Sequence, residues 1–257
     1  MTPSKPSNPH LLAPLQFKGA LAVGETIALD VDQMNKLAFR EVHVKEAFTV
    51  VSHDGTFFRA SLKSASPTEG SAVVYEQMGG STESPARITL VCAVLGRQRM
   101  ITVVQKATEL GCVRVVPVFS EHSVQPAELE KEKPWAWPGQ AIKATRQCRR
   151  ASVPEVLSAL PLETALAATY WKDARGRFSM DDREACRRED PFAKGAAPGE
   201  YALAVGPEGG WSDAERARLE KAGARPLALG SRVLRAETAV FAGLAILQHR
   251  LGDLRSA

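Results

Sequence analysis

The feature that most constrains the fold is a nearly continuous apolar run, Ile88–Leu95, which leads directly into a helical pattern. A strand that is apolar at successive positions needs cover on both faces, as in a parallel sheet between layers of helices. The helical pattern places one apolar face on Met100, Val103, Val104, Ala107 and Leu110, and Gly111 then provides a left-handed cap. The sequence therefore predicts an α/β fold whose ligands bind at the carboxyl ends of parallel strands.

Later segments continue this alternation. Further strands are expected at residues 113–119, 202–206 and 225–230, and helices at 140–151, 162–168, 212–223 and 237–251. Ser212 with Glu215 three residues later is the signature of a capping box. Residues 170–200 are polar and irregular, and we expect a loop or a surface insertion there.

The first 84 residues have a different texture. Short β-branched and aromatic segments flank Asp54-Gly55, a strong hairpin signal, and a short helix is expected at residues 32–40. The stretch QMGGSTESPA, residues 77–86, has the composition of a linker. We therefore predict two domains, a β-rich module at 1–84 and the α/β domain at 87–257.

Composition excludes some classes of protein. The net charge is +4, so a polyanionic partner is allowed but not required. The N-terminus lacks the pattern of a secretory signal, and no stretch approaches about 18 apolar residues, so we expect no membrane association. The four cysteines show no CxxC spacing, which favours reduced thiols in a cytoplasmic protein and no metal site.

Two loops at expected strand ends are candidates for ligand binding. Gly206–Gly210 (GPEGG) joins a buried strand to a capped helix, and its glycines allow backbone to approach a ligand closely. It matches neither the Walker nor the GxGxxG pattern. Leu229–Ala239 carries two arginines into an apolar helix, with Glu237 at the helix start. Taken alone, the first loop could be only a tight strand-to-helix turn, and the second only a helix cap with surface arginines.

Two further segments have weaker signals. The helix at 140–151 carries Lys143, Arg146 and Arg150 on one face, which suits phosphate oxygens but also describes a solvated helix face. Trp135 and Trp137 just upstream could stack on bases or pack against the sheet. His122, in a polar loop after the strand at 113–119, is weak evidence for a catalytic base.

Taken together and in this order, the motifs resemble the ribosomal small-subunit uridine methyltransferase family of RsmE type. The resemblance covers about the last two thirds of the chain. It rests on the segments Gln105–Gly111, Pro117–Val124, Gln147 with Arg150, Gly206–Gly210 and Leu229–Ala239. The chain departs from the family pattern at three positions. The family often has arginine at the position of His122, an acidic residue at that of Arg146 and glycine at that of Arg149.

The resemblance implies a SPOUT-type domain with a deep trefoil knot, a PUA-like N-terminal β-barrel and a homodimer. It implies S-adenosyl-L-methionine as cofactor, held by Val205, Gly206, Pro207, Glu208, Gly209, Gly210, Leu229, Gly230, Ser231, Val233, Leu234 and Arg235. Arg235 and Glu237 would be catalytic, and ribosomal RNA or the small subunit would be contacted by Arg40, Lys143, Arg146, Gln147 and Arg150.

The implied reaction is methylation of ring nitrogen 3 of a uridine in 16S ribosomal RNA. An unpaired base would be needed, and an arginine could stabilise the uracil anion. Glu208, Glu237 and His122 all stay open as the general base. Alternatives are a related knotted enzyme acting on ribose or another base, a non-catalytic RNA-binding assembly factor, and an ordinary nucleotide-binding α/β enzyme.

Overall fold

The computed structural model describes residues 8–180, 192 and 198–254. The chain folds into two compact units. The first comprises Ser84–Gln140 and the described part of Pro154–Ala257, and the second the described part of Lys5–Glu83 together with Ala141–Val153. The second unit therefore includes a segment, 141–153, that lies beyond the boundary expected from the linker composition.

The first unit is built on a parallel sheet with strand order β12-β10-β11-β6-β7-β8, and β9 also pairs with β7. The strands are β6 (Ala86–Ala93), β7 (Arg114–Phe119), β8 (Glu155–Val156), β9 (Leu160–Pro161), β10 (Gly176–Met180), β11 (Gly199–Val205) and β12 (Arg225–Leu227). The pairings of these strands are all parallel. The α/β fold expected from the apolar run is confirmed, and β6 lies at its centre.

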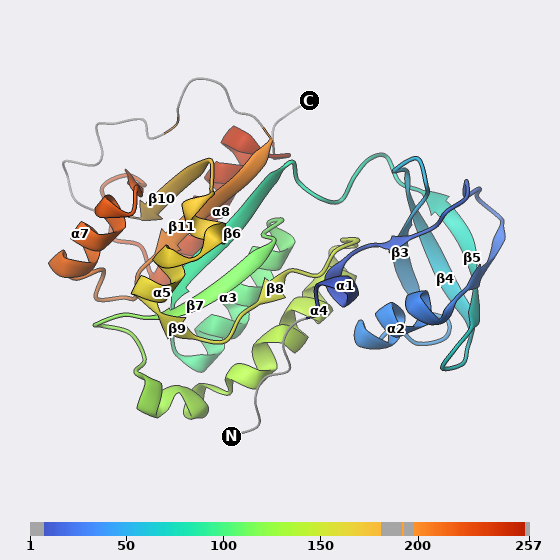
Figure 1. The fold of residues 1–257 in the computed structure, drawn as a ribbon, viewed down its shortest axis with the longest axis horizontal. Coiled ribbons are helices and arrows are strands. Elements are labelled where there is room, and N and C mark those ends of the chain that lie inside the picture. Colours follow the sequence, from blue (N-terminus) through green and yellow to red (C-terminus); the bar gives the residue numbers. More distant parts are fainter. Residues whose placement is uncertain (1–7, 181–191, 193–197, 255–257) are drawn as a thin grey trace. The chain divides into compact units, whose positions relative to one another are not determined.

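Helices cover both faces of this sheet (Figure 1). Helix α5 (Leu162–Ala167) lies on one face, whereas α3 (Arg97–Glu109) and α8 (Ala236–Leu251) lie on the other and pack against each other. Two other helices, α6 (Thr169–Lys172) and α7 (Asp213–Lys221), contribute Trp171 and Leu219 to the same core as α5. The loop between β7 and α4 (Trp137–Gln147) carries the short 3-10 helices η1 (Pro126–Glu132) and η2 (Pro134–Ala136).

The capping box expected at Ser212 is confirmed. Ser212 Oγ accepts the N–H of Glu215, and the Glu215 carboxylate accepts the N–H of Ser212. The expectation of a loop throughout 170–200 was wrong, because β10 lies inside that range and pairs with two strands. Its sequence, GRFSM, has no apolar run that would predict a strand. The strand can be recognised only from its pairing with β11 and β12. The rest of that prediction, at 181–191 and 193–197, falls outside the described residues.

The second unit contains a five-stranded sheet with strand order β1-β3-β4-β5-β2. Its elements are α1 (Pro9–Leu12), β1 (Leu15–Gln16), β2 (Thr26–Leu29), α2 (Val31–Phe39), β3 (Ala47–Val51), β4 (Phe57–Ala65) and β5 (Gly70–Gln77). The hairpin at Asp54-Gly55 is confirmed, since β3 and β4 pair in antiparallel fashion across it. Register shifts in the β4–β5 pair bend the sheet around a core that includes Leu37, Val50 and Leu62.

Among the residues that the structure describes, no helix is long and apolar enough to cross a bilayer.

Candidate active site

One cavity of the first unit brings the two candidate loops together. The loop after β11 and the loop after β12 both line it, at the carboxyl ends of parallel strands. The lining residues are Met180, Val205, Gly206, Pro207, Glu208, Gly209, Gly210, Trp211, Arg216, Leu229, Gly230, Arg232, Val233, Leu234, Ala236 and Ala239. Ser231 and Arg235 lie in the same loop but outside this lining.

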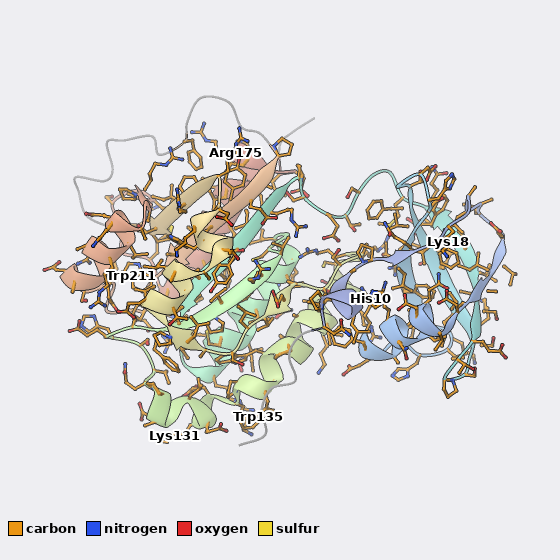
Figure 2. All side chains as sticks on the ribbon, viewed as in Figure 1. His10, Lys18, Lys131, Trp135, Arg175 and Trp211 are labelled. Carbon is orange, nitrogen blue, oxygen red and sulfur yellow. The ribbon has the colours of Figure 1, made fainter. Side chains whose placement is uncertain are left out.

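The loop Gly206–Gly210 depends on its glycines for shape. Gly210 has φ +71°, a left-handed conformation that favours glycine, and its N–H donates to Pro207 O at 2.9 Å. A Cβ on Gly206 would lie 3.1 Å from Cδ2 of Trp211, so the indole packs directly against bare backbone. Trp211 is buried beside α7 in the first unit (Figure 2). Each of the five residues of the loop lines the cavity, and at its three glycines only peptide groups can do so.

Glu208 is the one acidic side chain among the described residues that line the cavity. Its carboxylate forms an ion pair with the guanidinium group of Arg99, on the first turn of α3. Both side chains are about half exposed, so solvent screens the pair. The pair brings the glycine loop next to the first turn of α3 without contributing much to its stability.

The second loop carries its arginines on the surface. Arg232 and Arg235 are exposed, and Arg235 is the N-cap residue of α8. Val233 is 79% exposed, which is unusual for a large apolar side chain beside a cavity. Glu237 lies in the first turn of α8, where its Oε2 atom is buried and has no hydrogen-bond partner among the described residues.

A third loop, Ser120–Gln125, stands behind the glycine loop. A Cβ on Gly209 would lie 3.0 Å from Cβ of His122, and His122 Nδ1 is 3.3 Å from Gly210 O. His122 therefore packs against the glycine loop and does not line the cavity itself.

The residues expected to contact RNA lie in the second unit, and two of them are buried. Arg40 is 4% exposed and donates to the carbonyl groups of Leu12, Ala13 and Ala151. Burial lowers the pKa of its guanidinium to about 10, which leaves it charged at neutral pH. Arg150 is also buried and is held by Glu83. The guanidinium groups of Arg40 and Arg150 therefore bind carbonyl and carboxylate groups inside the second unit.

The remaining residues of that helix are more accessible. Arg146 is partly buried, donating to Glu41 O and pairing with Glu46 at 2.7 Å. Lys143 and Gln147 are exposed and line a shallow pocket with Glu46 and Arg146. Of the two tryptophans upstream, Trp137 is buried and Trp135, labelled in Figure 2, is 62% exposed. Lys143 and Gln147 thus remain as the exposed polar groups of the predicted set.

Comparison with known proteins decides the family. The family model described as an RNA methyltransferase domain matches residues 82–248, which is more than half of the chain and includes both candidate loops. The chain belongs to this RNA methyltransferase family. The match also spans the helices and strands that carry the cavity.

Relatives of this RNA methyltransferase match it over most of its length. Ribosomal RNA small subunit methyltransferase E of Aquifex aeolicus is 29% identical over 88% of this chain and 95% of its own length. The corresponding protein of Bacillus subtilis is 27% identical, over 79% of this chain and 82% of its own length. The resemblance to the RsmE-type family is therefore confirmed.

Solved structures of methyltransferases are also similar to this chain. The crystal structure of ribosomal RNA small subunit methyltransferase E from Neisseria gonorrhoeae, bound to S-adenosyl methionine, is 29% identical with a TM-score of 0.67. It covers 95% of this chain and 100% of that chain. A methyltransferase from Legionella pneumophila, in complex with the bound cofactor SAM, has a TM-score of 0.63 at 26% identity, over 93% and 98% of the two chains.

Three cavity residues of this RNA methyltransferase lie outside both candidate loops and were not predicted: Met180, Trp211 and Arg216. Arg232, Ala236 and Ala239 lie within the candidate loop Leu229–Ala239, although they were not singled out as cofactor contacts. Trp211, Arg232, Ala236 and Ala239 adjoin or belong to the two motifs, so the motifs carried a signal for them. Met180 ends the unpredicted strand β10, and Arg216 reaches the cavity from α7, so neither could be found without the fold.

Proposed function

We propose that this chain transfers a methyl group from S-adenosyl-L-methionine to ring nitrogen 3 of a uridine in the 16S ribosomal RNA of the small subunit. The observation that carries the proposal is the convergence of the Gly206–Gly210 and Leu229–Leu234 loops on one cavity. Family membership and relatives named for small-subunit ribosomal RNA methylation support the reaction and substrate.

The residues that line the cavity fit this cofactor. Peptide groups of the glycine loop can meet the hydrogen-bonding edges of adenine, while Leu229, Val233 and Leu234 offer apolar contact to its faces. A Cβ at Gly206 or Gly209 would lie 3.1 Å from Trp211 or 3.0 Å from His122, so glycine lets the backbone of the loop lie close to these two side chains. When bound, S-adenosyl-L-methionine supplies an electrophilic methyl group on a sulfonium sulfur.

We assign the substrate side of the site to Arg235 and Glu237. Loss of the N3 proton leaves an anionic uracil, and the exposed guanidinium of Arg235 can stabilise that charge. Oε2 of Glu237 is buried and unpartnered within the described part of the chain, which supports this side chain as the acceptor for the uridine N3–H. The target uridine must be unpaired, because N3 lies on its Watson–Crick edge.

Several broader assignments belong to the same proposal. The return of α8 from the edge strand β12 to pack beside the central strands supports a trefoil knot of SPOUT type. The bent five-stranded sheet with α2 supports a PUA-like RNA-binding module, with the domains divided near residues 84–87.

The exposed Val233 beside the cavity supports a homodimer in which a partner covers that loop. We place the enzyme in the cytoplasm, where ribosomal subunits are assembled.

The RNA contact is proposed for Lys143 and Gln147, with Arg146 at its edge. Arg40 and Arg150 keep a supporting role, because their buried guanidinium groups hold the helix end that presents the other residues.

The test is a methylation assay with labelled S-adenosyl-L-methionine on small ribosomal subunits from a strain that lacks this gene, followed by mass spectrometry of the labelled nucleoside. Labelled 3-methyluridine is the expected product. Another methylated nucleoside would keep the cofactor assignment and overturn the substrate. Cofactor binding without transfer would show that the substrate or its assembly state is wrong, whereas failure to bind the cofactor would favour the non-catalytic assembly factor.

A further inference from the structure

We infer that Glu215 is a positioning residue for the cofactor cavity, because its one buried carboxylate holds two loops together. This inference rests on the proposed function. Glu215 is 5% exposed and lies in the first turn of α7. It does not line the cavity itself, so its effect would pass through the backbone that it holds.

The two oxygens of this carboxylate serve different segments of the chain. Oε2 accepts the N–H of Ser212 at 2.9 Å, which closes the capping box. Oε1 accepts the N–H of Glu121 at 2.9 Å, from a residue 94 positions earlier in the chain. A capping box alone requires only the first of these bonds. The second joins the loop after β7 to the start of α7.

The loop that Glu215 grips is rigid in its own right. Ser123 Oγ accepts the N–H of Ser120 at 2.9 Å, and the Gln125 amide donates to Ser120 O at 2.9 Å. The N–H of Val124 donates to Val94 O, just beyond β6. A rigid loop transmits position, so holding Glu121 also fixes its neighbour His122.

His122 completes the connection to the cavity. Its Cβ lies 3.0 Å from where a Cβ of Gly209 would stand, and its ring nitrogen lies 3.3 Å from Gly210 O. The glycine loop therefore lies between the cavity and His122. By holding both Glu121 and Ser212, Glu215 fixes the position of the His122 loop relative to the segment that follows the glycine loop. Preorganised backbone binds a ligand more tightly because less order is lost on binding.

The chain offers a control that separates helix capping from loop positioning. Ser212→Ala removes the hydroxyl that accepts the Glu215 N–H but leaves both bonds of the Glu215 carboxylate. Glu215→Ala removes the carboxylate half of the capping box and the bridge to Glu121 together, while Ser212 Oγ can still accept the backbone N–H of residue 215. Glu215→Gln keeps one acceptor oxygen, so only one of the two N–H groups can be satisfied.

The experiment measures the dissociation constant for S-adenosyl-L-methionine by calorimetry, the melting temperature, and the hydrogen exchange of the Glu121 amide, on the full chain. We expect Glu215→Ala to weaken binding about tenfold, equivalent to about 1.4 kcal/mol, with Glu215→Gln in between. Faster exchange at Glu121 should accompany both changes. Ser212→Ala should lower the melting temperature but leave the affinity and the Glu121 exchange unaltered.

The outcomes are distinguishable. Equal loss of affinity in Ser212→Ala and Glu215→Ala would reduce Glu215 to a helix cap and overturn the inference. Unaltered affinity in a folded Glu215→Ala or Glu215→Gln protein would overturn it as well. If the unsubstituted chain binds no S-adenosyl-L-methionine, the proposed function fails first, and the positioning role at a cofactor site fails with it.

Discussion

Arg150 donates to Glu83 through Nη2 at 2.7 Å and Nε at 3.2 Å, across 67 positions of sequence. The other oxygen of Glu83 accepts the backbone N–H groups of Ala151 and Ser152 at 3.0 and 3.1 Å. The end of the basic helix is thereby fastened to the end of the β-rich module. An arginine that looks from sequence like an RNA contact is instead a structural cation.

Removal of this carboxylate should destabilise the second unit. Glu83→Ala removes the carboxylate that pairs with the guanidinium of Arg150, whose side chain is 4% exposed, so we expect a loss of about 3 kcal/mol in the free energy of unfolding. Urea denaturation measures it. Glu76→Ala, which removes the more exposed 3.6 Å pair with Arg149, is the control and should cost about 0.5 kcal/mol or less. Equal effects would contradict the structural role of Arg150.

Arg149 has a φ of +64°, in the left-handed region that favours glycine. The N–H of Arg150 donates to Thr145 O, so Arg149 takes the left-handed position of a Schellman motif that ends α4. Arg149→Gly should stabilise the protein by about 1 kcal/mol, seen as a higher melting temperature. Lys143→Gly, at an exposed position in the middle of α4, should destabilise it by about 1 kcal/mol. A destabilised Arg149→Gly protein would show that the pair with Glu76 outweighs the backbone strain.

Gly209→Val should remove cofactor binding while the protein stays folded. The new Cβ would lie 3.0 Å from Cβ of His122, so the glycine loop would have to move toward the cavity. We expect affinity for S-adenosyl-L-methionine to fall at least about tenfold, measured by calorimetry. Gly19→Val is the matched control, because no atom lies within 4 Å of the added Cβ. Tight binding by folded Gly209→Val protein would remove the role assigned to this loop.

Lys143→Glu should weaken RNA binding and flatten its salt dependence. Lys143 is exposed, so the substitution leaves the core intact, unlike a charge reversal at the buried Arg150. Each lost phosphate contact reduces the slope of log K against log salt by about 0.7 to 0.9. Binding measured from low to high salt tests this, with Lys131→Glu, at an exposed lysine in η1, as control. An unchanged slope would return this helix to the role of a solvated surface.

Acid sensitivity should depend in part on Glu46. The N–H of His43 donates to its carboxylate at 2.8 Å and Arg146 lies 2.7 Å away, and these contacts lower the pKa of Glu46 below its usual value. A lowered carboxyl pKa stabilises the fold above the unfolded pKa of about 4.3, and this contribution is lost as the pH falls through the folded pKa. Melting temperatures between about pH 3 and 7 should therefore fall less steeply with acid in Glu46→Gln than in the unsubstituted chain. Parallel curves would show that Glu46 contributes nothing to acid sensitivity.

Local signals predicted much of the fold. The apolar run at Ile88–Leu95, the capping box at Ser212 and the hairpin at Asp54-Gly55 each depend on residues close in sequence, and all three are confirmed. Strand β10 was missed because its five residues are stabilised by β11 and β12 on either side rather than by a pattern of their own.

The sequence by itself determined the α/β class, the two loops and their family, since motif identity and periodicity are local properties. Tertiary structure alone decided which charges are available. Arg40 and Arg150 look like Lys143 in the sequence, yet carbonyl groups and a carboxylate far away in the chain enclose them. The same is true of Glu215, a helix cap by its spacing, whose second oxygen holds Glu121. Burial and hydrogen bonding across long separations depend on how the chain packs, and no local pattern encodes them.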